Sequence, residues 1–263
     1  MNIAAQNRAA AYNSIICRAA KFAENAVRYF EFEYHRYSLA AWRDDRLRNP
    51  SAPSMAITID RHRDFVMAKK QDLERFAGHG DCETSFIRGV HEIPAIANND
   101  FIAYAFYDDY CSDAIAIAYE DYYEIEKRSM ISLNAPFFDR RSNPHHLLCL
   151  PSLQDLFAPD CDFERTPTYK FFYDGLAAAA SVILDIDLDY FTYQSPDDGI
   201  FVRREEDIRS AFARIRPAFS HMMSRVTTIA LARESVCCGG RENAAKIREI
   251  LLDIFKTDYN LSF

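Results

Sequence analysis

The sequence predicts an α/β fold with a mostly parallel central sheet. Short hydrophobic segments with strand character alternate along the chain with longer segments of helical periodicity, and this alternation is typical of such folds. Only seven glycines are spread over 263 residues, and no repeat or low-complexity tract interrupts the pattern. About half of the residues are apolar, so we expect one domain with a substantial core over residues 1–263.

The first half of the chain contains four expected elements. Apolar residues at spacings of three and four predict a helix over 4–30. The segment "SMAITID" (54–60) has the composition of a short buried strand and follows the breaker "NPSAPS". Further along, "NNDFIAYAFYDDY" (98–110) resembles a helix and "DAIAIAY" (113–119) resembles a strand.

Four more elements are expected in the second half. "SVILDIDLDYF" (181–191) is the strongest strand signal in the chain, and 204–225 has the pattern of a helix. "VTTIALAR" (226–233) predicts another strand, and two glycines lead into a last helix over 239–255. Because ligands of parallel α/β sheets gather at the carboxyl ends of strands, polar residues that end these strands are the first candidates for a site.

Charge and composition exclude several classes of function. A net charge of −8 provides no basic field for phosphate backbones, so we expect no nucleic-acid partner, whereas a basic peptide is compatible. The longest apolar run, 176–184, is too short to cross a bilayer, and the first 30 residues lack the apolar stretch of a signal peptide. Seven cysteines without a CxxC pair indicate reduced thiols, and we expect a cytoplasmic protein without membrane attachment.

Three carboxylates interrupt the strongest strand. In "ILDIDLDYF" side chains alternate between the two faces of a strand, so Asp185, Asp187 and Asp189 are expected to share one face. Like charges at this spacing raise one another's pKa, and burying them unpaired costs about 5 kcal/mol or more per ion. A cation should therefore offset them.

A second cluster has the same spacing. "ITIDRHRDF" places Asp60, His62 and Asp64 just past a short hydrophobic strand, although a polar turn in which Arg61 and Arg63 pair with the acids would explain this motif alone. If the two strands are neighbours, the clusters can converge on divalent ions. Oxygen and imidazole ligands without thiolate favour Mn²⁺ or Fe²⁺ over structural zinc, and two such ions would activate a water molecule.

The segments "DRHRD" and "DIDLDYF" resemble the DxHxD and DxD signatures of the arginase and histone-deacetylase superfamily. The aromatic-ended "DLDYF" is similar to the branch that includes peptide arginases, which mature ribosomally made peptides. The resemblance spans residues 30 to about 255 and implies a three-layer α/β/α fold of the arginase type. It also implies two Mn²⁺ ions bound by six side chains: His35, Asp60, His62, Asp64, Asp187 and Asp189.

Within that set, the resemblance implies that Asp60 and Asp187 bridge both ions. His35, in "FEFEYHRYSLAAW", and Asp64 would complete one site, and His62 and Asp189 would complete the other. Asp185 stands where arginases have a serine, so it is expected behind the ligands rather than among them.

The resemblance also implies catalytic and substrate-binding residues. Asp64 would orient the attacking hydroxide, and Glu234, in "TTIALARES", would bind the substrate guanidinium, with Glu242 as the rival. His91, in "GVHEIPAIANND", is the candidate proton donor by its order in the chain. Four other histidines stay open for that role: His79, His145, His146 and His221.

Departures from the arginase pattern bear on the substrate. This chain has "FEYHR" where free-arginine arginases have "GGDHS", Val66 where they have Asn, and "YFTYQSPDDGIFV" in place of a Gly- and Pro-rich run. Some of the missing groups grip the free α-amino and α-carboxylate groups. The departures therefore favour arginine within a precursor peptide, converted to ornithine with release of urea.

Two other functions stay open at this point. In a Mg²⁺-dependent DxD phosphatase or phosphotransferase, Asp185 would be the nucleophile and Asp187 the acid/base, which leaves the DxHxD motif unexplained. In a non-catalytic alternative, the protein is a metal-stabilised peptide-binding protein. The metal, the peptide and a homo-oligomeric state are not determined by the sequence.

Overall fold

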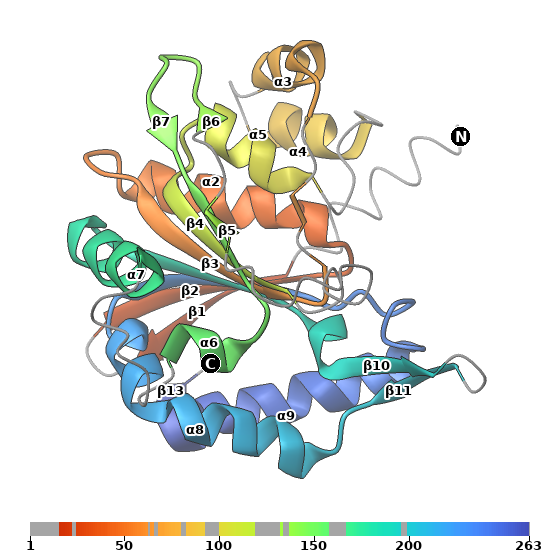
Figure 1. Cartoon of the computed structure of the whole chain (residues 1–263). Coiled ribbons are helices and arrows are strands. Elements are labelled where there is room, and N and C mark those ends of the chain that lie inside the picture. The colour runs from red at the N-terminus through yellow and green to blue at the C-terminus, as the bar shows by residue number, and fades with distance from the viewer. Residues whose placement is uncertain are drawn as a thin grey trace, which may run out of the picture.

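The computed structural model of the protein describes residues 16–22, 25–62, 64–65, 68–79, 83–92, 100–118, 132–133, 137–157, 167–195 and 199–262. They form a three-layer α/β/α fold, with a sheet between two layers of helices (Figure 1). The described strands of this sheet are β1 (Ile16–Phe22), β2 (Asn25–Phe32), β3 (Ser54–Asp60), β4 (Cys111–Ala118), β5 (Ser132–Leu133), β8 (Leu147–Leu150), β9 (Val182–Asp187), β12 (Val226–Ala232) and β13 (Leu261–Ser262).

The centre of the sheet is parallel, as the sequence predicts. The strand order is β13-β1-β2-β12-β9-β3-β4-β8-β5, and every pair from β2 to β8 is parallel. Antiparallel strands β1, β13 and β5 extend the sheet at its two edges. The carboxyl ends of six strands therefore meet at one edge, where polar side chains can converge.

Helices cover both faces of the sheet (Figure 1). One layer consists of α2 (Ser38–Arg48), α3 (Lys70–Ala77), α4 (Glu83–Glu92) and α5 (Phe101–Tyr107). The other consists of α6 (Leu153–Phe157), α7 (Pro167–Ala178), α8 (Glu205–Met223) and α9 (Arg241–Tyr259). Smaller elements are the 3-10 turns η1 (His35–Tyr37) and η4 (Leu188–Phe191) and the hairpins β6 (Phe137–Phe138) with β7 (Pro144–His145) and β10 (Thr192–Ser195) with β11 (Gly199–Val202).

Six of the eight expected elements are confirmed with small shifts of their ends. The strands expected at 54–60, 113–119 and 226–233 are β3, β4 and β12. The helices expected at 98–110, 204–225 and 239–255 are α5, α8 and α9. These segments combine a clear hydrophobic period with breakers at their ends, which is why sequence reasoning finds them.

The helix expected over 4–30 is wrong wherever the structure describes it. Residues 1–15 lie outside the described part of the chain, and β1 and β2 form an antiparallel hairpin. In β2, Val27 and Tyr29 pack on one face of the sheet while Phe30 and Phe32 pack on the other. A strand buried on both faces shows no clean alternation, so its apolar residues also fit a helical spacing.

The strand expected over 181–191 is right only as far as Asp187. The chain then turns into η4, and the side chain of Asp187 accepts a hydrogen bond from the backbone N–H of Asp189 (3.0 Å). The backbone N–H of Asp189 thus bonds to a side chain instead of to a neighbouring strand, so the strand ends there. Asp189 therefore lies on a turn rather than on the strand face that alternation predicts.

The two faces of the sheet have different side chains. Toward α8 and α9, Leu184 and Ile186 of β9 pack with large aliphatic and aromatic residues such as Phe212. Toward α2 and α5, the strands present many alanines, such as Ala116 and Ala230, and the helices fill that space with aromatic rings. Asp185 and Asp187 belong to the second face because they alternate with Leu184 and Ile186 along the strand.

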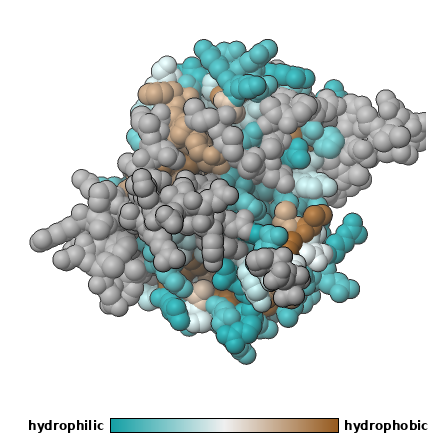
Figure 2. All heavy atoms as spheres, turned by 45° about the vertical axis from the view of Figure 1, so that its right-hand side comes forward, coloured by the Kyte–Doolittle hydropathy of each residue, from teal (hydrophilic) through white to brown (hydrophobic). Residues whose placement is uncertain are grey.

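None of the described helices has both the length and the apolar character needed to cross a bilayer. In the view of Figure 2, hydrophilic side chains cover much of the visible described surface, and hydrophobic ones form separate patches.

At the amino edge of the sheet, α2 is fastened by a buried acid. Asp45 is fully buried and accepts hydrogen bonds from the hydroxyls of Thr227 (2.7 Å), Thr228 (2.8 Å) and Ser54. Arg48 adds an ion pair at 3.2 Å. The charge is therefore fully solvated by protein donors, and it ties α2 to the starts of β3 and β12.

We expect Asp45→Ala to lower the free energy of unfolding by about 3 kcal/mol, because it leaves buried hydroxyls without an acceptor. Urea unfolding would measure the shift in midpoint. The matched control is Asp44→Ala, whose partly exposed carboxylate pairs with Arg48 at 2.9 Å and should contribute less than about 1 kcal/mol. Equal effects of the two substitutions would contradict this role of Asp45.

Candidate metal centre

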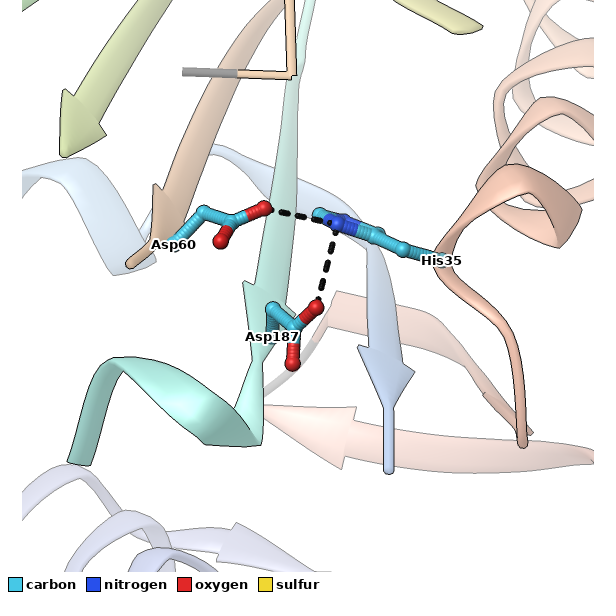
Figure 3. A group of neighbouring side chains, drawn as sticks. All are labelled: His35, Asp60 and Asp187. Carbon is cyan, nitrogen blue, oxygen red and sulfur yellow. Dashed lines mark ion pairs between the residues drawn. The ribbon is translucent and has the colours of Figure 1, made fainter. Parts of the chain in front are cut away.

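The two acid-bearing strands are neighbours in the sheet. β3 and β9 run parallel, and Ile59 pairs with Ile186, so Asp60 and Asp187 reach the carboxyl edge side by side. His35 comes from η1, the turn between β2 and α2, and its ring lies next to both carboxylates (Figure 3). Three segments distant in sequence therefore place polar side chains at the same point.

Nδ1 of the His35 imidazole faces three carboxylates. This atom is 2.8 Å from Oδ2 of Asp60, 2.5 Å from Oδ2 of Asp64 and 3.4 Å from Oδ2 of Asp187. Yet Nδ1 of His35 and Oδ2 of Asp60 and Asp64 are buried without hydrogen-bond geometry to any partner. Side chains that converge in this way without bonding one another have the arrangement of ligands around a cation.

Asp185 fixes the orientation of that imidazole. Oδ1 of Asp185 lies 2.9 Å from Nε2 of His35, and the same carboxylate accepts hydrogen bonds from Ser38 Oγ (3.0 Å) and Trp42 Nε1 (2.7 Å). Because the carboxylate accepts from Nε2–H, the lone pair of a neutral imidazole is on Nδ1, toward the other acids. A carboxylate behind a histidine is the usual support of a metal-binding imidazole.

A second group shares Asp60 with the first. One ligand atom each of Asp60, His62 and Asp189 lie within 4.8 Å of one another, as do those of His35, Asp60 and Asp187. Nδ1 of His62 is 3.6 Å from Asp60 and 3.4 Å from Asp189. The side chain of His62 is 44% exposed, so the cluster opens to solvent on this side.

Burial and mutual repulsion raise the pKa of three carboxyl groups here. For Asp64 and Asp187 burial is the largest cause, followed by the charges of Asp60 and Asp189 respectively. Burial and the charge of Asp60 raise the pKa of Asp189 to about 7. Burial also acts against protonation of His35, but the charges of Asp185 and Asp64 raise its pKa well above the usual value. Bound cations would relieve this repulsion.

The donor set fits a divalent cation. Carboxylate oxygens and imidazole nitrogens, with no thiolate among them, suit Mn²⁺ or Fe²⁺. The buried atoms of His35, Asp60 and Asp64 that lack hydrogen-bond geometry are the observation that a bound cation would explain. These buried clusters can therefore hold a metal ion, and the shared Asp60 allows two ions to lie next to each other.

Glu234 lies beside the clusters, whereas Glu242 does not. Glu234 follows β12, is 6% exposed and accepts a hydrogen bond from the backbone N–H of His35 at 2.8 Å. Burial raises its pKa, and a φ of 37° places it in the left-handed region. Glu242 is exposed in the first turn of α9.

His91 lies on α4, and its Nδ1 is 3.0 Å from the hydroxyl of Tyr37. Tyr37 belongs to η1, the same turn as His35, so this contact links His91 to the edge of the cluster. The structure places the other histidines elsewhere: His79 beside Ser85, His145 and His146 before β8, and His221 exposed on α8.

Of the residues that could pair with the DxHxD acids, Arg61 directs its guanidinium to Gln194 of β10 (3.2 Å), and its backbone N–H is 3.4 Å from Oδ1 of Asp189. Arg63 and Val66 lie outside the described residues.

Sequence reasoning missed Ser38 and Trp42. The only available signal was that Asp185, inside an apolar strand, needs buried donors.

No family model matches this chain, and no curated protein matches it. These comparisons therefore assign no family to the chain.

We expect Asp60→Asn to lower the content of bound Mn²⁺ more than His62→Ala does, because both ligand groups share the carboxylate of Asp60 and only one of them contains His62. Metal analysis of protein loaded with Mn²⁺ and desalted would measure the content. Asp207→Asn, which alters an exposed carboxylate paired with Arg204, is the control. A Mn²⁺ content that does not respond to Asp60→Asn would contradict a shared centre.

We expect Asp185→Asn to weaken Mn²⁺ binding about 10- to 100-fold, because the amide supports the imidazole of His35 less well. Trp42 is the chain's only tryptophan and donates to Asp185, so its fluorescence should report the titration. Ser38→Ala removes one donor to the same carboxylate and should have a smaller effect. Unchanged affinity in Asp185→Asn would show that Asp185 does not support the centre.

Proposed function

We propose that the protein is a metal-dependent hydrolase of the arginase and deacetylase superfamily that converts arginine side chains of a peptide to ornithine and releases urea. The observation that carries this proposal is the pair of ligand groups sharing Asp60, with the buried carboxylate of Glu234 beside them. The motif resemblance supports the superfamily, and the position of Glu234 supports the guanidinium as the reacting group.

Glu234 would bind the guanidinium. Its Oε1 is held by the backbone N–H of His35, so the carboxylate is attached to the same turn that supplies a metal ligand. A carboxylate accepts two parallel N–H bonds from a guanidinium, which fixes the plane of the substrate. The hydrogen bond between His35 and Glu234 would hold the guanidinium carbon at a fixed distance from the metal ligands, and such positioning favours hydrolysis.

The chain's residues have separate tasks in this reaction. The six ligands of the centre would hold the Mn²⁺ ions, which would supply Lewis acidity and lower the pKa of bound water. Asp64 would orient the water that attacks the guanidinium carbon. As the bond from that carbon to the side-chain nitrogen breaks, His91 would give a proton to the departing amine, and the hydroxyl of Tyr37 holds its ring in place.

The substrate is proposed to be an arginine within a precursor peptide rather than free arginine. The segments that bind the α-amino and α-carboxylate groups in free-arginine arginases have other residues in this chain. Because the side chain of His62 is 44% exposed, we place the approach of the peptide on this side, with its backbone outside the centre.

The burial of Asp185 disfavours the phosphotransferase alternative. A nucleophilic aspartate must reach a phosphorus atom, but Asp185 is 0% exposed and bonded to His35, Ser38 and Trp42. Its role in the structure is to orient other residues.

Incubation of the Mn²⁺-loaded protein with arginine-containing peptides should lower the peptide mass by about 42 Da per modified arginine and release urea. Glu234→Gln should reduce kcat/KM about 100-fold, since the amide cannot accept both N–H bonds. Mass spectrometry and a urea assay would measure the two effects, with Glu242→Gln as the matched control.

Free arginine should react far more slowly than the peptide. Tight peptide binding without urea release would support the non-catalytic alternative and overturn the hydrolase. Equal rates for Glu234→Gln and Glu242→Gln would overturn the role of Glu234.

A further inference from the structure

A second cluster of metal-type ligands lies away from the candidate centre. Asp109 follows α5, Asp139 lies between β6 and β7, and His145 is in β7. One ligand atom of each residue lies within 4.8 Å of the others. Asp109 lies two residues before β4 and His145 two residues before β8, so this cluster is at the amino edge of the sheet, opposite to the edge where Asp60 lies.

His145 presents a buried ring nitrogen without a hydrogen-bond partner. Its Nδ1 lies 2.5 Å from the carbonyl oxygen of Ser112, and because a carbonyl can only accept, Nδ1 must carry the proton. The lone pair of the neutral ring is then on Nε2, which is buried and has no hydrogen-bond partner. The residue is 3% exposed, and its ring stacks on Phe106 at 5.2 Å. A backbone carbonyl on the other nitrogen is the common support of a metal-binding histidine.

The turn between β6 and β7 holds Asp139 in an ionised form. Its carboxylate accepts hydrogen bonds from the backbone N–H of Arg141 (2.7 Å) and from both the backbone and side chain of Asn143 (2.8 Å each). A negative charge is therefore fixed close to the imidazole.

Asp109 completes the group with a second carboxylate. Its Oδ2 pairs with Arg46 at 3.0 Å, and a φ of 57° places its backbone in the left-handed region. Two further guanidinium groups lie nearby, those of Arg140, which pairs with Asp108 at 2.6 Å, and Arg141. A cavity of about 360 Å³, lined in part by Asp109 and Asp139, has room for the water molecules that would complete a coordination shell.

We propose that His145, Asp109 and Asp139 bind a divalent transition-metal cation, which fastens the β6–β7 hairpin to the end of α5 and the start of β4. One nitrogen and two oxygen ligands suit Zn²⁺ or Mn²⁺, and Zn²⁺ binds such sites more tightly. This site is structural and separate from the proposed hydrolytic centre. It shares no residue with that centre, so either proposal can fail without the other.

Zn²⁺ binding should be tested in the double variant Asp60→Asn/Asp187→Asn, which removes shared ligands of the candidate centre. After incubation with Zn²⁺ and desalting, metal analysis should find one ion per chain, and Zn²⁺ should raise the Tm of this variant. Adding His145→Gln should abolish both effects. The matched control, His146→Gln, alters the next residue, whose half-buried ring pairs with Asp113 instead, and should retain the ion.

Asp139→Asn provides a second measurement in case His145→Gln does not fold. It keeps an acceptor for the turn while removing the charge, so it should weaken Zn²⁺ binding at least tenfold with the same circular dichroism spectrum. The proposal is overturned if the double variant binds no Zn²⁺. It is equally overturned if bound Zn²⁺ persists unchanged in folded His145→Gln or Asp139→Asn.

Discussion

The constraint on which the structure depends is the repulsion among buried acids at the carboxyl edge of the sheet. Asp60, Asp64, Asp187 and Asp189 lie close together, and burial and mutual charge raise the pKa of three of them. A fold that needed only stability would place apolar residues here, since a buried carboxylate without a partner costs several kcal/mol. The arrangement is consistent with a centre built for cations, and the surrounding donors orient the ligands toward one point.

The buried acids of the sheet differ in how many hydrogen-bond donors surround them. At the amino edge, Asp45 is surrounded by hydroxyls and an arginine, so its charge is satisfied by the protein itself. Asp185 is satisfied in the same way by Ser38, Trp42 and His35. In front of His35, Oδ1 of Asp60 and Oδ1 of Asp187 each accept a backbone N–H, whereas Oδ2 of Asp60 and Oδ2 of Asp64 are buried without a hydrogen-bond partner. This contrast distinguishes acids whose charge the protein satisfies from acids that can hold a cation.

The turn η1 contacts candidate site residues outside the ligand groups as well. This single turn contributes the ring of His35 to the cluster, its backbone N–H to Glu234, and the hydroxyl of Tyr37 to His91. The candidate residues for metal binding, guanidinium binding and proton transfer are therefore attached to one short segment. Because α2 follows directly and is fastened by Asp45, the position of η1 is set by packing at both ends of this helix.

The sequence by itself determined the parallel sheet and the two acid-ended strands, because burial on both faces produces continuous apolar runs and alternation assigns their polar residues to one face. It did not determine the β1–β2 hairpin or the end of β9 at Asp187, since a short apolar run fits more than one period and local hydrogen bonds decide where it ends. Only the tertiary structure brought Trp42 to Asp185 and His145 to Asp109 and Asp139. Those contacts join elements that are distant in sequence or leave no local pattern, and they are set by how helices pack on the sheet.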